Sequence, residues 1–423
     1  MSEQLSVVEI CAGAGGQSLG LHKAGFNHAL ALELDETAAL TLRSNLERIQ
    51  NSVDVRVGDV ADPGLWTPEE LQGVDLLAGG VPCPPFSIAG KQLGSQDERD
   101  LFAWAVELAG RVKPRALMLE NVRGLSLPRF SGYRQAVADR LAELGYWSEW
   151  RLLQASDFGV PQLRPRFVLV AMLHDDARFF QWPEPTGELV TVGAALRDLM
   201  SEGGWKYADA WSEYANDVGP TIVGGSKKHG GADLGPTRAR AGWARLGVDG
   251  RGVADAAPDR RARSFRTLMP RLTTAMVAVV QGWGPEYEWA FEGRKTAVYR
   301  QIGNAFPPPV ALAVGRSIRR ALERRGSSQE LSEAQAHDRI YALLRDAPAA
   351  IPMGEILLRL GGDLDIATVE RRLADLDRDF GLFRETQGNS DLYALGAFKA
   401  FRGQKDHLRN EVFAQPRRRA RIS

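Results

Sequence analysis

The stretch LSVVEICAGAGG, residues 5–16, decides the fold of this chain. Its apolar half, Leu5–Ile10, predicts a buried strand, and the glycine-rich half, Cys11–Gly16, predicts a tight turn into a helix. Such a turn lets a ligand approach the backbone closely. The glycines lack the dinucleotide-binding spacing and no P-loop lysine follows, so alone they fit an ordinary turn of any α/β protein equally well.

Further strand-like runs follow, and several are separated by amphipathic stretches of helical period. The expected strands are Ala29–Glu33, Val53–Val57, Val74–Ala78, Ala116–Leu119, Trp150–Gln154 and Phe167–Ala171. The expected helices are Glu36–Leu46, Asp100–Val112 and Tyr133–Leu144. Alternating strands and helices build a mostly parallel sheet that is covered on both faces. The sequence therefore predicts a doubly wound α/β domain over residues 1–185.

The composition is that of an ordinary globular chain, with 25% charged and 44% hydrophobic residues among 423. No apolar run approaches the ~18 residues of a membrane span, and the N-terminus lacks a signal-peptide pattern. Cys11 and Cys83, the two cysteines, provide no disulfide framework, so we expect a cytoplasmic protein without a membrane partner. The net charge of zero argues against a nucleic-acid partner unless positive charge is concentrated in one part of the chain. The arginine-rich end, residues 417–421, shows such a concentration.

The second half of the chain changes in character. Residues 200–263 are rich in glycine and have little periodicity, so loops should dominate there. Regular patterns return at Arg271–Gln281 and in a helix from Val310 to about Arg324. We expect residues 186–299 to form a separate region, and residues 300–326 to complete the first domain.

Residues 327–423, beyond the short linker Gly326–Ser328, form a further module with a basic tail. Its expected elements are the helices Ala336–Arg345, Pro352–Leu360 and Ala367–Asp379 and the strands Leu382–Thr386 and Leu392–Leu395 around a turn at Gly388-Asn389. Three helices and a hairpin favour a winged-helix module, although many small bundles share the pattern. Such a module would bind nucleic acid through its tail, dimerise or dock a partner.

Acidic residues and a cysteine follow the predicted strands. Glu33 and Asp59 end the second and third strands, where a carboxylate is placed to bind the ribose or adenine of a nucleoside cofactor. Cys83 lies in the proline-flanked segment GGVPCPPFS, residues 79–87, directly after the fourth strand. Parallel sheets bind ligands at this edge, and a thiolate in an exposed, constrained loop is a nucleophile. A lone cysteine is more often a small buried hydrophobe, but the prolines disfavour that alternative.

A second group of polar residues is expected in the same crevice. Glu120, in Glu-Asn-Val after the fifth strand, would be protonated near neutral pH if partly buried. The cluster Gln162-Leu163-Arg164-Pro165-Arg166 enters the seventh strand, and its two arginines suit an anionic or carbonyl-bearing substrate. Structural ion pairs and helix caps are the alternatives for these residues.

In order, these segments resemble the sequence blocks of the cytosine-C5 DNA methyltransferases of bacterial restriction–modification systems. Gly303–Pro308 and Arg271–Thr273 match further blocks, and the likeness spans roughly residues 5–325. The chain departs from the family pattern at Cys11, where an aromatic residue is common, and at Pro84, where glutamine is commoner. The resemblance implies a doubly wound methyltransferase fold, S-adenosylmethionine as cofactor and double-stranded DNA as substrate.

The resemblance also implies roles for individual residues. Cys83 would add as a thiolate to carbon 6 of a flipped-out cytosine, Glu120 would bind ring N3 and the exocyclic amine, and Arg166, helped by Arg164, would hold O2. The implied cofactor-binding residues are Cys11, Ala12, Gly13, Ala14, Gly15, Gly16, Glu33, Asp59, Val60, Leu101, Asn304 and Ala305. The implied DNA-binding residues are Ser87, Gln162, Lys227, Lys228, Arg238 and Arg240.

No metal is expected, and a cognate restriction endonuclease is an expected functional partner. We expect a monomer and leave a dimer open. Two other functions stay open, methylation of tRNA and DNA-binding regulation by a vestigial catalytic domain.

Overall fold

The computed structural model describes residues 4–50, 52–82, 101–225, 231–331, 337–361, 364–387 and 390–401. Four predicted site residues lie outside these ranges: Cys83, Ser87, Lys227 and Lys228. The predicted turn at Gly388-Asn389 and the arginine-rich end lie outside them as well.

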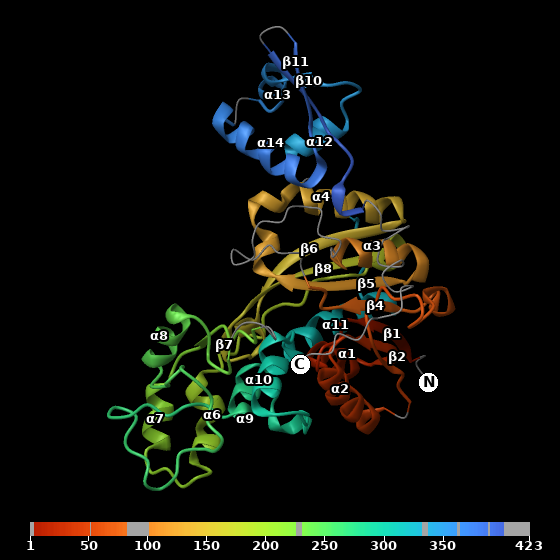
Figure 1. Cartoon of the computed structure of the whole chain (residues 1–423). Coiled ribbons are helices and arrows are strands. Elements are labelled where there is room, and N and C mark those ends of the chain that lie inside the picture. Colours follow the sequence, from red (N-terminus) through yellow and green to blue (C-terminus); the bar gives the residue numbers. More distant parts are fainter. Residues whose placement is uncertain are drawn as a thin grey trace, which may run out of the picture.

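A seven-stranded sheet in the order β3-β2-β1-β4-β5-β8-β6 forms the centre of the molecule (Figure 1). Its strands are β1 (Leu5–Ile10), β2 (Phe26–Glu33), β3 (Val55–Val57), β4 (Leu76–Gly79), β5 (Ala116–Val122), β6 (Tyr146–Gln154) and β8 (Pro165–Leu173). β8 runs antiparallel to both of its neighbours, and the other neighbouring pairs are parallel. Each of the seven predicted strands is confirmed, as is the mostly parallel sheet.

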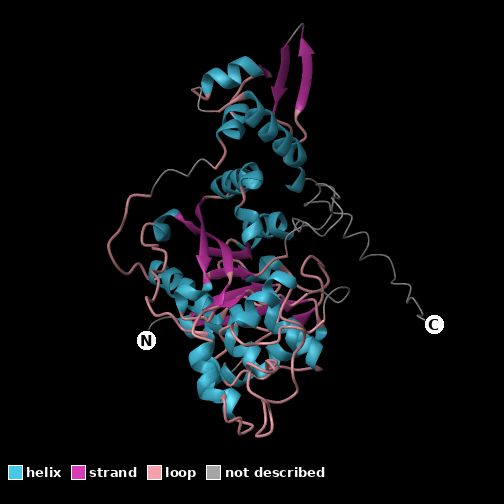
Figure 2. Ribbon diagram, turned by 90° about the vertical axis from the view of Figure 1, so that its left-hand side faces the viewer, coloured by secondary structure: helices cyan, strands magenta, loops and turns pink. Residues whose placement is uncertain are grey.

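Helices cover both faces of this sheet, which confirms the doubly wound arrangement (Figure 2). The helices of this part are α1 (Gly16–Ala24), α2 (Glu36–Ile49), α3 (Leu101–Val112), α4 (Ser131–Glu143), α5 (His174–Ala177) and α11 (Pro308–Leu322). α1 and α11 share the buried cluster on one face, while α3 and α4 pack on the other. The alternation of strand residues explains both clusters, because Val7 faces α1 and Val8 faces α3. α11 thus completes a fold that begins at the opposite end of the sequence.

The region from Trp182 to the end of α10 is smaller than the central domain and contains more loops. Its helices are α6 (Val192–Ser201), α7 (Ala208–Tyr214), α8 (Thr237–Arg245), α9 (Thr274–Val280) and α10 (Lys295–Asn304), and β7 (Gln162–Leu163) pairs with β9 (Gly219–Pro220). Loops do dominate residues 200–263, but the sequence analysis missed α7 and α8. Each short helix is anchored by one fully buried tryptophan, Trp211 or Trp243, and a single large anchor leaves no periodic pattern.

The C-terminal module contains α12 (Arg339–Arg345), β10 (Ile351–Pro352), α13 (Met353–Arg359), α14 (Ile366–Phe380), β11 (Phe383–Gln387) and β12 (Ser390–Ala394). The three predicted helices and the hairpin strands are confirmed. β10 was not predicted, and it pairs with β12 to make a three-stranded sheet in the order β10-β12-β11. One face of α14 supplies the core of this module through Val369, Leu373 and Leu376. No helix in the described ranges has the length and hydrophobicity to cross a membrane.

Candidate active site

The glycine-rich turn between β1 and α1 is held open by backbone conformation. Cys11, Gly13 and Gly15 have positive φ angles of 51°, 59° and 93°. A Cβ added to Gly13 would meet no heavy atom within 4 Å, so free space lies against this part of the backbone. A Cβ on Gly16 would lie 2.4 Å from the carbonyl oxygen of Phe306, so the chain after α10 closes against the other side of the turn. The predicted residues Gly16 and Ala305 therefore lie against each other at this turn.

Glu33 is joined directly to this turn. Its Oε2 accepts a hydrogen bond of 2.7 Å from the backbone N–H of Gly13, and its Oε1 accepts one of 2.8 Å from Asp35. Burial raises the pKa of the Glu33 carboxyl, and the backbone donors of Asp35 and Gly13 oppose that shift. Each oxygen keeps a further lone pair for a ligand hydroxyl.

Asp59 and its neighbours follow β3 at the same edge of the sheet. The N–H of Gly58 donates to the carbonyl of Glu33 at 2.9 Å, and Oδ1 of Asp59 accepts from the N–H of Ala61 at 3.0 Å. Val60 is buried, and the partly buried Leu101 at the start of α3 packs into the same apolar cluster. The structure thus brings Glu33, Asp59 and Val60 together beside the glycine turn.

The chain leaving β4 passes between the glycine turn and Glu120. A Cβ on Gly80 would lie 3.4 Å from Oε2 of Glu120 and 3.9 Å from the carbonyl oxygen of Cys11. The side-chain amide of Asn121 donates to the carbonyl of Val81 at 3.1 Å and anchors this segment to β5. That anchoring role of Asn121 was not predicted from the sequence, although the residue stands beside Glu120. Cys83 follows Gly80 by three positions and lies outside the described residues.

Glu120 and Arg166 form a buried ion pair. Nε of Arg166 lies 2.6 Å from Oε1 of Glu120, each side chain being 10% exposed, although the angle is not that of a good hydrogen bond. Burial raises the pKa of Glu120, and the charges of Arg166 and Arg164 oppose this. Burial also lowers the pKa of Arg166. A guanidinium nevertheless keeps its proton in proteins, so Arg166 remains the cation of the pair.

Arg164 has a different environment from Arg166. Its side chain is fully buried and donates to the carbonyl oxygens of Ile222 at 2.6 Å, Gly303 at 2.7 Å and Ala305 at 3.0 Å. Burial lowers its pKa, and the neighbouring charge of Arg166 lowers it further. Arg164 therefore ties three chain segments together.

Gln162 belongs to the same internal network, which corrects the expected contact with DNA. Its side chain has no exposed surface. The amide nitrogen donates to Val280 at 3.1 Å and to the side chain of Gln281 at 2.8 Å, and its oxygen accepts from the N–H of Ile222 at 2.8 Å. A polar side chain that is saturated inside the core has no group left to meet a base or a phosphate. Gln281, which also donates to the carbonyl of Ala305 at 2.7 Å, was missed by the sequence analysis.

Two further residues join the candidate site to the rest of the chain. The exposed Asn304 donates through its amide to the carbonyl of Gly225 at 3.3 Å, which connects the end of α10 to the glycine-rich region. Trp289, which the sequence analysis did not identify, donates through its indole N–H to the carbonyl of Ala14 at 3.0 Å. An indole N–H can only donate, and it usually finds an acceptor when it is buried. A tryptophan in the sequence is therefore a weak indication of such a hydrogen bond to the backbone.

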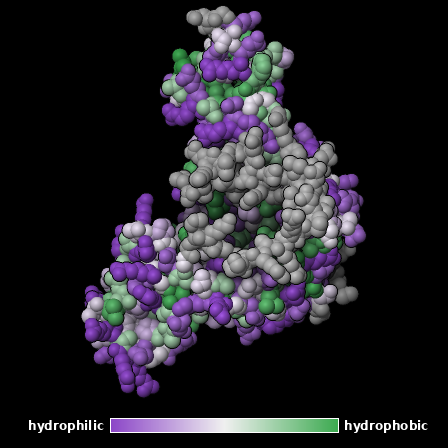
Figure 3. All heavy atoms as spheres, viewed as in Figure 1, coloured by the Kyte–Doolittle hydropathy of each residue, from purple (hydrophilic) through white to green (hydrophobic). Residues whose placement is uncertain are grey.

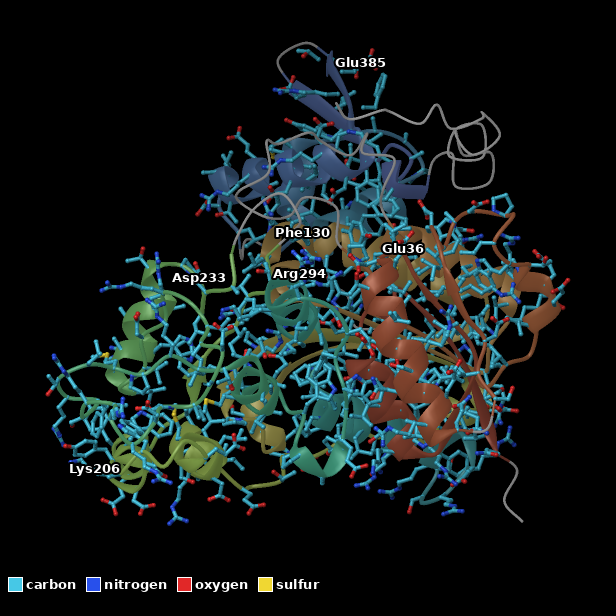
Figure 4. The ribbon with its side chains drawn as sticks, turned by 60° about the horizontal axis from the view of Figure 1, so that its bottom comes forward. Glu36, Phe130, Lys206, Asp233, Arg294 and Glu385 are labelled. Atoms are coloured by element: carbon cyan, nitrogen blue, oxygen red, sulfur yellow. The ribbon has the colours of Figure 1, made fainter. Side chains whose placement is uncertain are left out.

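The predicted DNA-contacting arginines lie on α8. Arg238 is exposed and Arg240 is half-buried, and Lys227 and Lys228 fall outside the described residues. In Figure 4 the region that carries Lys206 and Asp233 lies to one side of Arg294, and α2 with Glu36 lies to the other. Hydrophilic side chains dominate the surface of this region (Figure 3). Within the described ranges, His, Cys, Asp and Glu side chains form no group of metal-ligand size.

Comparisons with known proteins agree with this geometry. The sequence profile of the family described as C-5 cytosine-specific DNA methylase matches residues 5–320. The chain is 58% identical over 421 residues, 100% of each chain, to the Type II methyltransferase M.NaeI of Lentzea aerocolonigenes. It is 49% identical over 325 residues, 76% of this chain and 99% of the relative, to the Type II methyltransferase M.NgoMIV of Neisseria gonorrhoeae.

Solved structures agree on the fold. A mutant of Spodoptera frugiperda DNMT2 superposes with a TM-score of 0.52 at 16% identity, over 75% of this chain and 99% of that chain. The central sheet is accordingly that of the methyltransferase fold. Since the family profile covers the whole of this sheet and both ends of the candidate site, the chain belongs to the C-5 cytosine-specific DNA methylases, which transfer a methyl group from S-adenosylmethionine to carbon 5 of cytosine in DNA.

Proposed function

We propose that this enzyme methylates a cytosine within a specific double-stranded DNA sequence through a covalent adduct with Cys83. The observation that carries the proposal is the position of Gly80, which lies beside both Glu120 and the carbonyl of Cys11. The chain therefore enters the nucleophile segment between the acid of the active site and the glycine turn. Cys83 follows Gly80 by three positions in the sequence.

The glycine turn fits S-adenosylmethionine. The open space at Gly13 leaves room for a ligand against the backbone, and Glu33 keeps lone pairs for two ribose hydroxyls. Asp59 and Val60 would contact the adenine, with Leu101, Asn304 and Ala305 lining the rest of the pocket. When bound, the cofactor supplies an electrophilic methyl group on a sulfonium centre.

The residues of the chain would activate the cytosine. The Cys83 thiolate adds to carbon 6, which breaks the aromaticity of the ring and makes carbon 5 nucleophilic. Glu120 hydrogen-bonds ring N3 and the exocyclic amine, and its raised pKa favours the protonated form that can donate to N3. Arg166 lies against Glu120 and would bind O2 of the base. After carbon 5 has gained the methyl group, loss of its proton releases the thiolate from carbon 6.

Arg164 would act through other residues. Its guanidinium binds backbone carbonyls of residues 222, 303 and 305, so we assign it a positioning role between the recognition region and the cofactor pocket. This changes the sequence-based expectation, in which Arg164 assisted Arg166 on the base.

Residues 186–299 are proposed as the target-recognition domain, inserted between residues 1–185 and 300–326 of the catalytic domain. The target base must leave the duplex, which costs about a few kcal/mol, because its carbon 6 is inaccessible within the stack. Lys227, Lys228, Arg238 and Arg240 would contact phosphates and base edges. The DNA-contacting role expected for Ser87 stays a prediction.

Two proposals concern the wider system. The element order α12-β10-α13-α14-β11-β12 is that of a winged-helix module, which supports that assignment for residues 327–423. Both curated relatives are named Type II methyltransferases, so a cognate restriction endonuclease is the proposed functional partner of a monomeric enzyme.

Bisulfite sequencing of DNA from cells that express the protein tests the function. We expect methylated cytosines at one recurring sequence and none in cells expressing the Cys83→Ala variant. The same assay on tRNA separates the enzyme from tRNA methyltransferases. Absence of methylation from both polymers, with DNA binding retained, would favour a DNA-binding regulator instead.

A further inference from the structure

The C-terminal module is docked on the catalytic domain through helix α4 (Figures 1 and 2). Asp139 of α4 accepts hydrogen bonds from the hydroxyl of Tyr341 at 3.0 Å and from Arg345 at 2.8 Å. The hydroxyl of Ser131, at the start of α4, donates to the buried Asp338. These contacts join one helix of the catalytic domain to the first helix of the module.

Apolar packing continues this interface. Ala136 of α4 belongs to the hydrophobic core of the module. A Cβ on Gly132 would lie 2.3 Å from a methyl carbon of Leu376, so α14 approaches α4 as closely as a glycine allows. Phe398 packs against both the module core and the catalytic core beneath α4. The module thus shares its core with the catalytic domain.

Aromatic rings in successive contact lead from the module to the active site. Within the module, Tyr341 and Phe380 lie 5.0 Å apart between ring centroids, and Phe380 and Phe398 are also 5.0 Å apart. Phe398 meets Tyr133 of α4 edge-to-face at 5.3 Å. These distances lie in the range at which aromatic pairs attract one another.

The chain of rings continues under the catalytic sheet. Tyr133 contacts Phe102 at 6.5 Å, Phe102 stacks on Trp150 at 5.3 Å, and Trp150 stacks on Phe167 at 5.0 Å. Phe167 is the next residue after Arg166, the partner of Glu120. Phe102 is the second residue of α3, the helix that follows the nucleophile segment. The rings therefore end on two elements next to the proposed active site, namely the start of α3 and strand β8, where Phe167 lies on the face of the sheet opposite to Arg166.

We propose that the C-terminal module is a brace of the active site and that Phe398 is its positioning residue. Through Tyr133 and Phe102, Phe398 would fix the start of α3 and the strand that holds Arg166 against Glu120. This inference rests on the proposed role of Arg166.

The charges of the folded module favour the bracing role and disfavour a DNA-binding surface. Residues 337–401 contain eleven acidic and eight basic residues, whereas phosphate-binding surfaces are basic. α14, the third helix, is already engaged by the catalytic domain, because Arg372 donates to the carbonyl of Pro128 and the hydroxyl of Ser131. One side of the helix that helix-turn-helix proteins use for DNA thus packs against α4 and its neighbours.

The test compares two phenylalanines of the module in the full-length enzyme. Phe398→Ala removes the ring that bridges the two cores, and Phe383→Ala, in a residue that is 58% exposed on β11, is the matched control. We expect Phe398→Ala to lower kcat roughly tenfold or more with unchanged DNA affinity, since small misplacements of catalytic groups are costly. Hydrogen exchange should rise in the β8 peptide that contains Arg166. The Phe398→Tyr variant keeps an aromatic ring and should retain most of the wild-type kcat. The Phe383→Ala variant should leave kcat, DNA affinity and hydrogen exchange unchanged.

Other outcomes overturn the brace. If Phe398→Ala lowers only the melting temperature, the module is a passive support. If it lowers DNA affinity while kcat stays normal, the module binds DNA. Should Phe398→Ala fold poorly, Phe398→Leu keeps the apolar bulk without the ring, and normal kcat there would equally contradict the proposal. An Arg166→Ala variant separates the two hypotheses, because full activity in that variant contradicts the proposed mechanism and not merely the brace.

Discussion

Arg166 places its Nε 2.6 Å from Oε1 of Glu120 although the two residues are not directly paired across their strands. In the antiparallel register of β5 and β8, Glu120 pairs with Val168 and Arg166 pairs with Val122, so the ion pair is diagonal. Each side chain is 10% exposed. Breaking a buried pair by removing one partner costs about 3–5 kcal/mol, because the remaining charge is left without compensation. A test of Glu120 therefore needs a substitution that keeps the shape of the side chain, so that the loss of its charge and of its acidic proton is the main change.

Glu120→Gln is that substitution. The amide retains the size of the carboxyl and can still hydrogen-bond, but it has no acidic proton to transfer to ring N3 and leaves Arg166 without its counter-ion. We expect kcat to fall by roughly 10²–10⁴-fold, the usual contribution of a general acid, with a far smaller loss of DNA affinity. Single-turnover methylation and a DNA-binding titration measure the two effects. Near-normal turnover would make Glu120 a structural residue.

Cys83→Ala should abolish methyl transfer while cofactor and DNA still bind. The reason is chemical, since alanine lacks the thiolate that is proposed to add to carbon 6. The wild-type enzyme should also form a stable covalent adduct with DNA that contains 5-fluorocytosine, because fluorine cannot leave as the proton does. Gel electrophoresis under denaturing conditions detects the adduct. Cys11→Ala is the control, and it should still form the adduct.

The sequence predicted the central fold well because that fold follows from local patterns. Buried parallel strands such as Leu5–Ile10 are continuous apolar runs, and amphipathic helices such as α2 show their period directly. α7 and α8 were missed because each depends on a tertiary contact of one tryptophan. The two-residue β10 was missed for a similar reason, since it exists only through its pairing with β12.

The sequence allowed us to predict which site residues lie at the same edge of the sheet, but not which residues each of them contacts. Strand-end positions placed Glu33 and Glu120 at one edge of the sheet, and the structure has both there. Arg164 and Arg166, two positions apart, were expected to act together. In the structure Arg166 meets Glu120, whereas Arg164 binds carbonyls of residues 222, 303 and 305, which no local sequence pattern connects. The internal role of Gln162 depends on the same distant segments.

Arg164→Lys tests the positioning role. A lysine keeps the positive charge, but an ammonium cannot reach three separate carbonyls with the fixed fork of a guanidinium. Buried carbonyls left without donors cost about 1–3 kcal/mol each, so the free energy of unfolding should fall by an amount in that range or above. Urea denaturation measures this loss, and the affinity for S-adenosylmethionine should fall with it because Gly303 and Ala305 are released. Unchanged stability and cofactor affinity would show that the segments hold together without Arg164.

Arg238→Ala or Arg240→Ala should weaken DNA binding or relax the choice of site while leaving cofactor binding intact. If the lost contact is to a phosphate, the slope of log affinity against log salt concentration should become shallower by about one. If it is to a base, the free-energy difference between the target sequence and other sequences should fall by about 1–3 kcal/mol. Arg197→Ala is a control within the same region, because that exposed guanidinium is paired with Asp209 at 2.7 Å. Unchanged affinity and site preference in both variants would move recognition to other residues.

His337 gives the docked module a predicted dependence on pH. Burial lowers the pKa of its imidazole to about 4, and the charge of Arg134 lowers it further, while Asp139 opposes the shift. The folded protein therefore holds this histidine neutral, whereas an unfolded chain protonates it near its ordinary pKa of about 6.5. As the pH falls from 6.5 towards 4, the unfolded state gains a proton that the folded state does not, so the free energy of unfolding decreases.

His337→Gln removes this linkage. The drop in melting temperature between about pH 7 and about pH 5 should be smaller in the variant than in the wild-type enzyme, because the unfolded chain no longer gains a proton at this position. The backbone N–H of residue 337 still donates to the side chain of Gln135, as it does at 2.7 Å in the wild type, so the contact itself is not the variable. His174→Gln, in an exposed residue, is the matched control and should leave the wild-type drop unchanged. An equal drop in all three proteins would mean that His337 is protonated alike in the folded and unfolded states. Any loss of stability at low pH would then come from other groups.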